Sequence, residues 1–100
     1  MIVRYSRRAR DDLAKILEYL DERSPRGARN VKLAIKRAID AIGQHPNVGH
    51  ATGRGATRGL PVGGYPYLVY WIVEADEVWV VHIRHGARKP WRTYTNGRTQ

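Results

Sequence analysis

Ionisable side chains gather at one place in this chain of 100 residues, directly after an apolar run near its C-terminal end. The segment Val78 to Trp91 reads VWVVHIRHGARKPW, so two histidines, two arginines and a lysine follow the apolar residues. No acidic residue comes after Glu77, which leaves these cations without an acidic neighbour in sequence. Because a β-branched run is typical of a strand, we expect basic side chains at the rim of a sheet, available to an outside anion.

The residue types of this cluster suit two kinds of chemistry. Cleavage of RNA without a metal requires a base for the 2′-hydroxyl, cations for the charge on the phosphate and an acid for the leaving oxygen. His85, Arg88 and Tyr94 have such side chains, because imidazole titrates near neutrality, guanidinium grips phosphate at two points and phenol donates a proton or stacks. The alternative is recognition of a target or partner, with His85 hydrogen bonded to backbone at the strand end. The residues expected to bind are Arg84, His85, Arg88, Lys89 and Trp91.

The charge and composition of the chain limit its class. Its 100 residues suffice for one domain with a modest core. With 18 Lys and Arg against 9 Asp and Glu, the net charge of +9 favours nucleic acid, an acidic protein or an anionic surface as partner. No secretory signal follows Met1, and the longest apolar run, 67–73, is far shorter than the roughly 20 residues of a membrane helix. We therefore expect a cytoplasmic protein without a membrane partner.

Neither a metal nor a cofactor is expected. The four histidines include no pair at the helical i, i+4 spacing, and the chain has no Cys to support them. The Gly-rich stretch 53–59 lacks the Gly-Lys-Ser/Thr ending of a phosphate loop and precedes a strand rather than a helix. We interpret it as a flexible connection.

Two amphipathic helices are expected to position the cluster. Ser6 is suited to cap a helix over 7–22, in which apolar residues recur at the spacing of one buried stripe. Ser24 and Pro25 begin a second helix that ends at Gly43. A tight turn between them makes an antiparallel hairpin. The basic stripe of the second helix, which we expect to be a solvated face, consists of Arg29, Lys32 and Lys36.

Short strands are expected at the start of the chain and in its second half. Gly63 and Gly64 suit the turn of a β-hairpin, and the polar, Gly-rich stretch 44–59 is typical of a surface loop. Segments rich in β-branched and aromatic residues predict strands at 2–5, 60–62, 67–73 and 78–84.

Alternation along the last strand predicts which of its faces meets the core. Trp79, Val81 and Ile83 fall on one face, which we expect to be buried. The opposite face becomes more polar towards its C-terminal end, so we expect the functional groove there. That face consists of Val78, Val80, His82 and Arg84.

These elements predict an α+β fold. We expect a small twisted antiparallel sheet with the N-terminal antiparallel helical hairpin packed on one face, in the order β-α-α-β-β-β. The sequence shows no internal repeat or linker, so we expect a single domain over 1–92 followed by a polar tail over 93–100.

The order of elements and several short motifs resemble the RelE/ParE superfamily of bacterial toxins from type II toxin–antitoxin modules, often labelled plasmid-stabilisation proteins. The resemblance covers residues 3–91. The motifs that carry it are Val3-Arg4-Tyr5-Ser6, Ala9-Arg10-Asp11-Asp12-Leu13, Ile16-Leu17-Glu18-Tyr19-Leu20, His45-Pro46-Asn47-Val48-Gly49, Tyr67-Leu68-Val69-Tyr70-Trp71 and Ile83-Arg84-His85-Gly86-Ala87-Arg88.

Within that superfamily the chain looks more like the ParE branch, whose members inhibit DNA gyrase, than the RelE branch. RelE toxins are ribosome-dependent mRNA endonucleases with several basic side chains on the central strands and a Tyr near the C-terminus. By that resemblance, this chain offers Arg58, Arg88 and Tyr94, whereas Leu60 and Tyr67 stand where two further cations are expected. The resemblance therefore implies a binder of gyrase rather than a nuclease.

The function we expect is that of a ParE-type toxin that arrests growth through DNA gyrase and is silenced by a cognate antitoxin. An acidic, disordered antitoxin segment would be attracted to this basic domain and fold on contact. The main alternative is a RelE-like enzyme that acts on mRNA at the ribosome. A third is a basic nucleic-acid-binding module without toxicity. The enzyme would use Arg58, His85, Arg88 and Tyr94.

Overall fold

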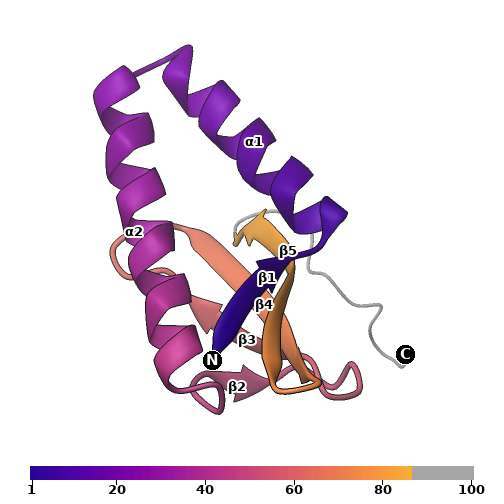
Figure 1. Cartoon of the computed structure of the whole chain (residues 1–100). Coiled ribbons are helices and arrows are strands. Elements are labelled where there is room, and N and C mark those ends of the chain that lie inside the picture. The colour runs from indigo at the N-terminus through magenta and orange to yellow at the C-terminus, as the bar shows by residue number, and fades with distance from the viewer. Residues whose placement is uncertain (87–100) are drawn as a thin grey trace.

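In the computed structural model, which describes residues 1–86, a helical hairpin covers one face of a five-stranded sheet (Figure 1). This confirms the predicted α+β fold and the order of its elements, with one short strand added. The elements are β1 (Ile2–Tyr5), α1 (Arg7–Asp21), α2 (Pro25–Gln44), β2 (His50–Ala51), β3 (Arg58–Pro61), β4 (Tyr67–Glu74) and β5 (Glu77–His85).

Both helices begin at the predicted serine caps. The Ser6 hydroxyl accepts a hydrogen bond from the Ala9 N–H at 3.0 Å, and the Ser24 hydroxyl accepts one from the Gly27 N–H at 3.0 Å. Each bond satisfies an amide that has no partner inside the first turn of its helix. The expected helix ends are accurate to one residue, because α1 ends at Asp21 and α2 at Gln44.

The sheet is mixed, which corrects the antiparallel sheet expected above. Its strand order is β1-β5-β4-β3-β2, and β1 runs parallel to β5 while all other neighbours are antiparallel. A parallel neighbour requires the chain to cross back over the sheet, and the helical hairpin makes that crossing. Polar residues also pair where we expected only the loop 44–59, since β2 and the start of β3 lie within it.

A bulge in β5 decides which of its side chains enter the core. Tyr70 of β4 pairs with His82, but its neighbour Trp71 pairs with Val80, so Val81 is an extra residue. An extra residue reverses the alternation of side chains. The predicted burial of Ile83 is therefore confirmed, whereas the faces predicted for the residues before the bulge were wrong. Val78 and Val80 are fully buried, and Trp79 and Val81 are half-buried.

The core lies between the helices and the central strands β4 and β5. Trp71 is fully buried there, and its indole N–H donates to the Pro46 carbonyl at 3.0 Å, which ties the segment after α2 to the sheet. The α2 side of the core is an apolar stripe that consists of Ala28, Val31, Ile35, Ile39 and Ile42.

Two substitutions in α2 test this packing. Ile35 is 1% exposed, so Ile35→Ala should lower the free energy of unfolding by about 2–5 kcal/mol, because it leaves a cavity. Leu33→Ala removes a side chain that is 47% exposed and should change it by less than about 0.5 kcal/mol. Urea denaturation followed by circular dichroism measures both values, and equal losses would contradict the assigned faces of α2.

Candidate functional site

The edge of β5 is completed partly by a strand and partly by side chains of the α1 region. β1 ends at Tyr5, opposite Val80, and β5 continues beyond it to His85. The Ser6 hydroxyl approaches the Val81 carbonyl at 3.3 Å. Further along, the Asp12 carboxylate accepts a hydrogen bond from the Ile83 N–H at 3.0 Å. Because a strand edge presents backbone groups that need partners, these contacts dock α1 against the part of the β5 edge that extends beyond β1.

The same carboxylate oxygen also binds a histidine. His82 is 6% exposed, and its Nδ1 lies 2.7 Å from Asp12 Oδ2. That oxygen already accepts from the Ile83 amide, so Nδ1 carries the proton and donates it. The Nε2 atom is then an acceptor, and it lies 3.4 Å from Nη2 of Arg8.

Burial lowers the pKa of His82 from its ordinary value of 6.5. The hydrogen bond and negative charge of Asp12 act in the opposite direction, and the positive charges of Arg8 and Arg84 lower the pKa further. His82 is therefore a neutral imidazole at pH 7, with a fixed tautomer and a fixed ring orientation. Its fixed ring can in turn hold the side chains that it contacts, Asp12, Arg8 and Tyr70, in place.

Tyr70 joins His82 to the basic rim. Its ring stacks on the imidazole with centroids 5.7 Å apart and an interplanar angle of 18°. Its hydroxyl oxygen accepts a hydrogen bond from Nε of Arg84 at 3.2 Å, and Nη1 of Arg84 donates to the His85 carbonyl at 3.1 Å. These bonds hold the guanidinium, and within residues 1–86 its Nη2 donors are left available to an anion. We call Asp12, His82, Tyr70 and Arg84 the β5 network.

A groove of about 1030 Å³ opens between the helical hairpin and the end of β5. Apolar side chains of both helices and of β5 line it together with tyrosines of α1 and β4, and most of its ionisable residues are basic. A surface of this kind suits a ligand that is both apolar and acidic. The basic residues along the groove are Arg8, Lys15, Arg84 and His85, and its larger apolar contacts are Ile16, Tyr19, Leu20, Val31, Tyr67 and Ile83.

The structure brings together only some of the residues proposed from the sequence. Arg84 and His85 lie along the groove, and the His85 ring packs edge-on against Tyr67 with centroids 5.3 Å apart. Arg58 does not join them. It pairs with Trp71 of β4, whereas His85 pairs with Tyr67 of the same strand. These two positions of β4 are four residues apart, which is about 13 Å at ~3.3 Å per residue. The predictions for Arg88, Lys89, Trp91 and Tyr94, and for the tail 93–100, lie outside the described residues.

The guanidinium of Arg58 is already engaged. Its Nε donates to the Val48 carbonyl and its Nη2 donates to the Gly49 carbonyl, each at 3.1 Å. These bonds fasten the loop after α2 to β3, so Arg58 has a structural role at that end of the sheet.

Reasoning from sequence missed the α1 side of the site. Arg8, Asp12 and Lys15 line the groove, and none was proposed as a site residue. One signal was present, because Asp12 lies three residues after Ala9 and four before Ile16, on the stripe that should be apolar. A charge on a buried stripe usually has a specific partner.

Residues 1–86 contain neither a metal-binding cluster nor a membrane-spanning helix. Over that range no three side chains of the metal-binding types come together in a way that could hold an ion. Neither helix there is both long enough and apolar enough to cross a membrane.

Comparison with known proteins identifies relatives of this chain. Residues 3–90 match the family model of the ParE toxin of the type II toxin–antitoxin system, parDE. The chain is 36% identical over 83 residues to Toxin RelE2 of Caulobacter vibrioides. This alignment covers 81% of this chain and 90% of that protein.

Solved structures share the fold at lower identity. A chain of the chromosomal ParDE system from P. aeruginosa aligns with a TM-score of 0.77 at 20% identity, covering 85% of this chain and 95% of that one. A chain of the intact E. coli RelBE toxin–antitoxin complex aligns with a TM-score of 0.65 at 14% identity, covering 87% and 98%.

Removal of the Asp12 carboxylate tests the β5 network. Asp12→Ala leaves the Ile83 N–H and the His82 Nδ1–H without their acceptor, so the free energy of unfolding should fall by about 1–3 kcal/mol. Asp11→Ala removes an exposed carboxylate of the same helix and should change it by less than about 0.5 kcal/mol. Urea denaturation at pH 7 compares the two, and similar losses would mean that Asp12 does not hold α1 on β5.

The lowered pKa of His82 predicts how stability depends on pH. The unfolded chain takes up a proton on this residue near pH 6.5, whereas the folded protein does so only at lower pH. The free energy of unfolding should therefore decrease as the pH falls below 6.5, by up to about 1.4 kcal/mol per pH unit. His82→Gln should reduce this slope, while His45→Gln, which removes an exposed histidine, should keep it. Denaturation curves from pH 7 to 5 give the slopes, and an unchanged slope in His82→Gln would contradict the assignment.

Proposed function

This chain belongs to the ParE toxin family of type II toxin–antitoxin systems, and we propose that it arrests bacterial growth by inhibiting DNA gyrase when no antitoxin is bound. The observation that carries the proposal is the arrangement of the cations around β5. Tyr70 holds Arg84 through a hydrogen bond to Nε. Arg58, which a nuclease site would require beside His85, instead pairs with Trp71, four residues along β4 from Tyr67, the partner of His85. This arrangement supports recognition of a protein target over cleavage of RNA.

The proposed contact surface with gyrase is the rim at the end of β5. Arg84 and His85 present a guanidinium and an imidazole there, next to an apolar groove. In sequence they continue directly into Arg88, Lys89 and Trp91, which add two cations and an aromatic anchor of the kind that often contributes strongly to binding.

The groove is the proposed site for the antitoxin. Its apolar lining and basic residues complement an acidic segment that carries large apolar side chains. A disordered antitoxin segment would fold as it fills the groove, and its acidic residues would meet Arg8, Lys15 and Arg84. This proposal agrees with the toxin–antitoxin complexes among the similar structures. Since gyrase and antitoxin are both cytoplasmic, we place the toxin in the cytoplasm.

Induction of the chain in bacteria without its antitoxin tests the proposed target. We expect growth arrest, loss of negative supercoiling in a reporter plasmid and accumulation of gyrase-trapped DNA breaks. Mapping of mRNA 5′ ends in the same cells should reveal no new cuts in the ribosomal A site. Cut mRNA with normal supercoiling would instead establish the RelE-like nuclease, and unaffected growth would favour a non-toxic module.

A pair of variants then tests the rim. Arg84→Ala removes the held guanidinium and should reduce gyrase-trapped breaks by about 5–150-fold, the effect of losing about 1–3 kcal/mol of binding. Arg10→Ala removes an exposed cation of α1 outside the groove lining and should leave the breaks unchanged. Equal toxicity of the two variants would exclude Arg84 from the contact with the target.

A further inference from the structure

The excess positive charge of the chain is unevenly distributed over the two helices. The residues of α1 include four basic and four acidic side chains, so this helix has no net charge. The residues of α2 include five basic side chains and one acidic one, which gives a net charge of +4 on one element. The outer face of α1 is exposed to water although this helix has no net charge. Exposure to water alone therefore does not explain the net charge of +4 on α2.

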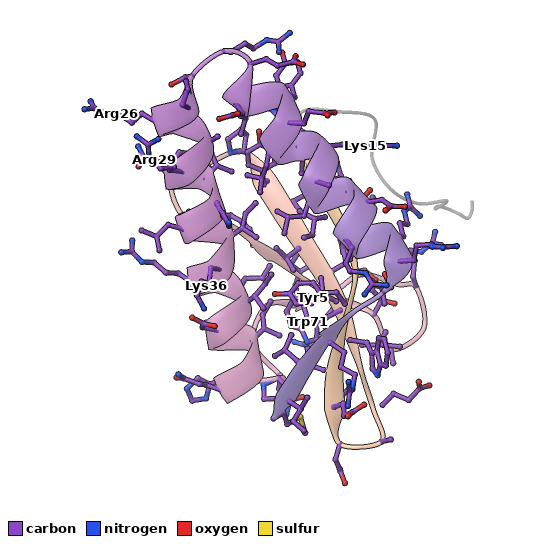
Figure 2. All side chains as sticks on the ribbon, turned by 45° about the horizontal axis from the view of Figure 1, so that its top comes forward. Tyr5, Lys15, Arg26, Arg29, Lys36 and Trp71 are labelled. Atoms are coloured by element: carbon purple, nitrogen blue, oxygen red, sulfur yellow. The ribbon has the colours of Figure 1, made fainter. Side chains whose placement is uncertain are left out.

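All five cations of α2 are exposed, and the structure leaves them nearly unneutralised. Figure 2 shows Arg26 and Arg29 projecting from the side of α2 that faces away from α1. Among the described residues, the one ion pair in this group joins Lys36 to Asp40 at 3.7 Å, and both side chains of that pair are well exposed. Such a pair is screened by water and adds little. The five cations are Arg26, Arg29, Lys32, Lys36 and Arg37.

We propose that this outer face of α2 docks on the phosphate backbone of duplex DNA. The cations extend over residues 26–37, about 17 Å of helix at ~1.5 Å per residue. Duplex DNA carries about ten phosphate charges over that length, and its major groove is wide enough to admit a helix. The two surfaces therefore match in charge and in size.

The composition of α2 favours a duplex over single strands or an apolar peptide. Proteins that bind single-stranded nucleic acid stack bases on aromatic rings, and α2 contains no Phe, Tyr or Trp. A peptide partner would need apolar anchors, whereas Leu33 is the one large apolar side chain that α2 exposes. What remains is a rigid row of cations, which suits contacts to phosphates without reading of the base sequence.

The DNA surface is separate from the groove proposed for the antitoxin. α2 contributes Gly27, Asn30 and Val31 to that groove and none of its five cations. The protein would thus hold DNA and a protein partner at the same time. This inference stands whether or not gyrase is the target, because it rests on α2 alone.

Binding of the purified protein to a fluorescein-labelled duplex of 20 base pairs provides the test. The α2 variant R26Q/R29Q/K32Q removes three cations from the proposed surface, and the control variant R7Q/R10Q/R54Q removes three exposed cations elsewhere. The net charges of the two variants are equal, so they differ only in where the positive charge was removed. Thermal unfolding followed by circular dichroism verifies that both keep the fold.

Fluorescence anisotropy between 0.05 and 0.2 M KCl should separate the two variants. In the α2 variant the dissociation constant should rise by about tenfold or more, and the slope of log K against log salt should flatten by about 0.9 for each phosphate that the protein no longer neutralises. In the control variant the dissociation constant should rise by no more than about twofold. Equal losses of affinity in both variants, no binding by the unmodified protein, or equally tight binding to duplex RNA would each overturn the proposal. The assay contains neither gyrase nor antitoxin, so its failure would not touch the function proposed above.

Discussion

The site depends on the double hydrogen bond to the Asp12 carboxylate. One oxygen accepts from the Ile83 backbone and from the His82 ring, and this places α1 against the edge of β5 that extends beyond β1. A partly buried carboxylate needs such partners to offset its lost contact with water. With α1 held there, Arg8 and Lys15 of α1 line one groove together with Arg84 of β5.

The bulge at Val81 sets the other half of the geometry. By reversing the alternation of β5, it turns Ile83 towards the helices and places His82 beside Tyr70 on the opposite face. Tyr70 then reaches Arg84 through its hydroxyl. Bulges commonly occur where a side chain must be redirected near a functional site. Here the extra residue Val81 sets the faces of β5 on which Ile83, His82 and Arg84 lie.

Two surfaces of different character carry basic side chains, the groove and the outer face of α2. The cations around the groove border apolar and aromatic side chains, which suits a folded or folding protein segment. The cations of α2 border no aromatic residue of their own helix, which suits a polyanion with a regular backbone. A small toxin with two such surfaces would hold its inhibitor without covering its contact to DNA.

The sequence by itself determined what local chemistry controls. Ser6 and Ser24 begin helices because their hydroxyls cap nearby amides, apolar periodicity defines the hairpin, and the family motifs identify the fold. Only the tertiary structure decided the parallel pairing of β1 with β5 and the bulge at Val81, since both depend on contacts between segments more than 70 residues apart or on neighbouring strands. Asp12 and His82 are 70 residues apart, so their hydrogen bond could not be predicted from the sequence. The one sequence feature that indicated it was a charged residue on the apolar stripe of α1.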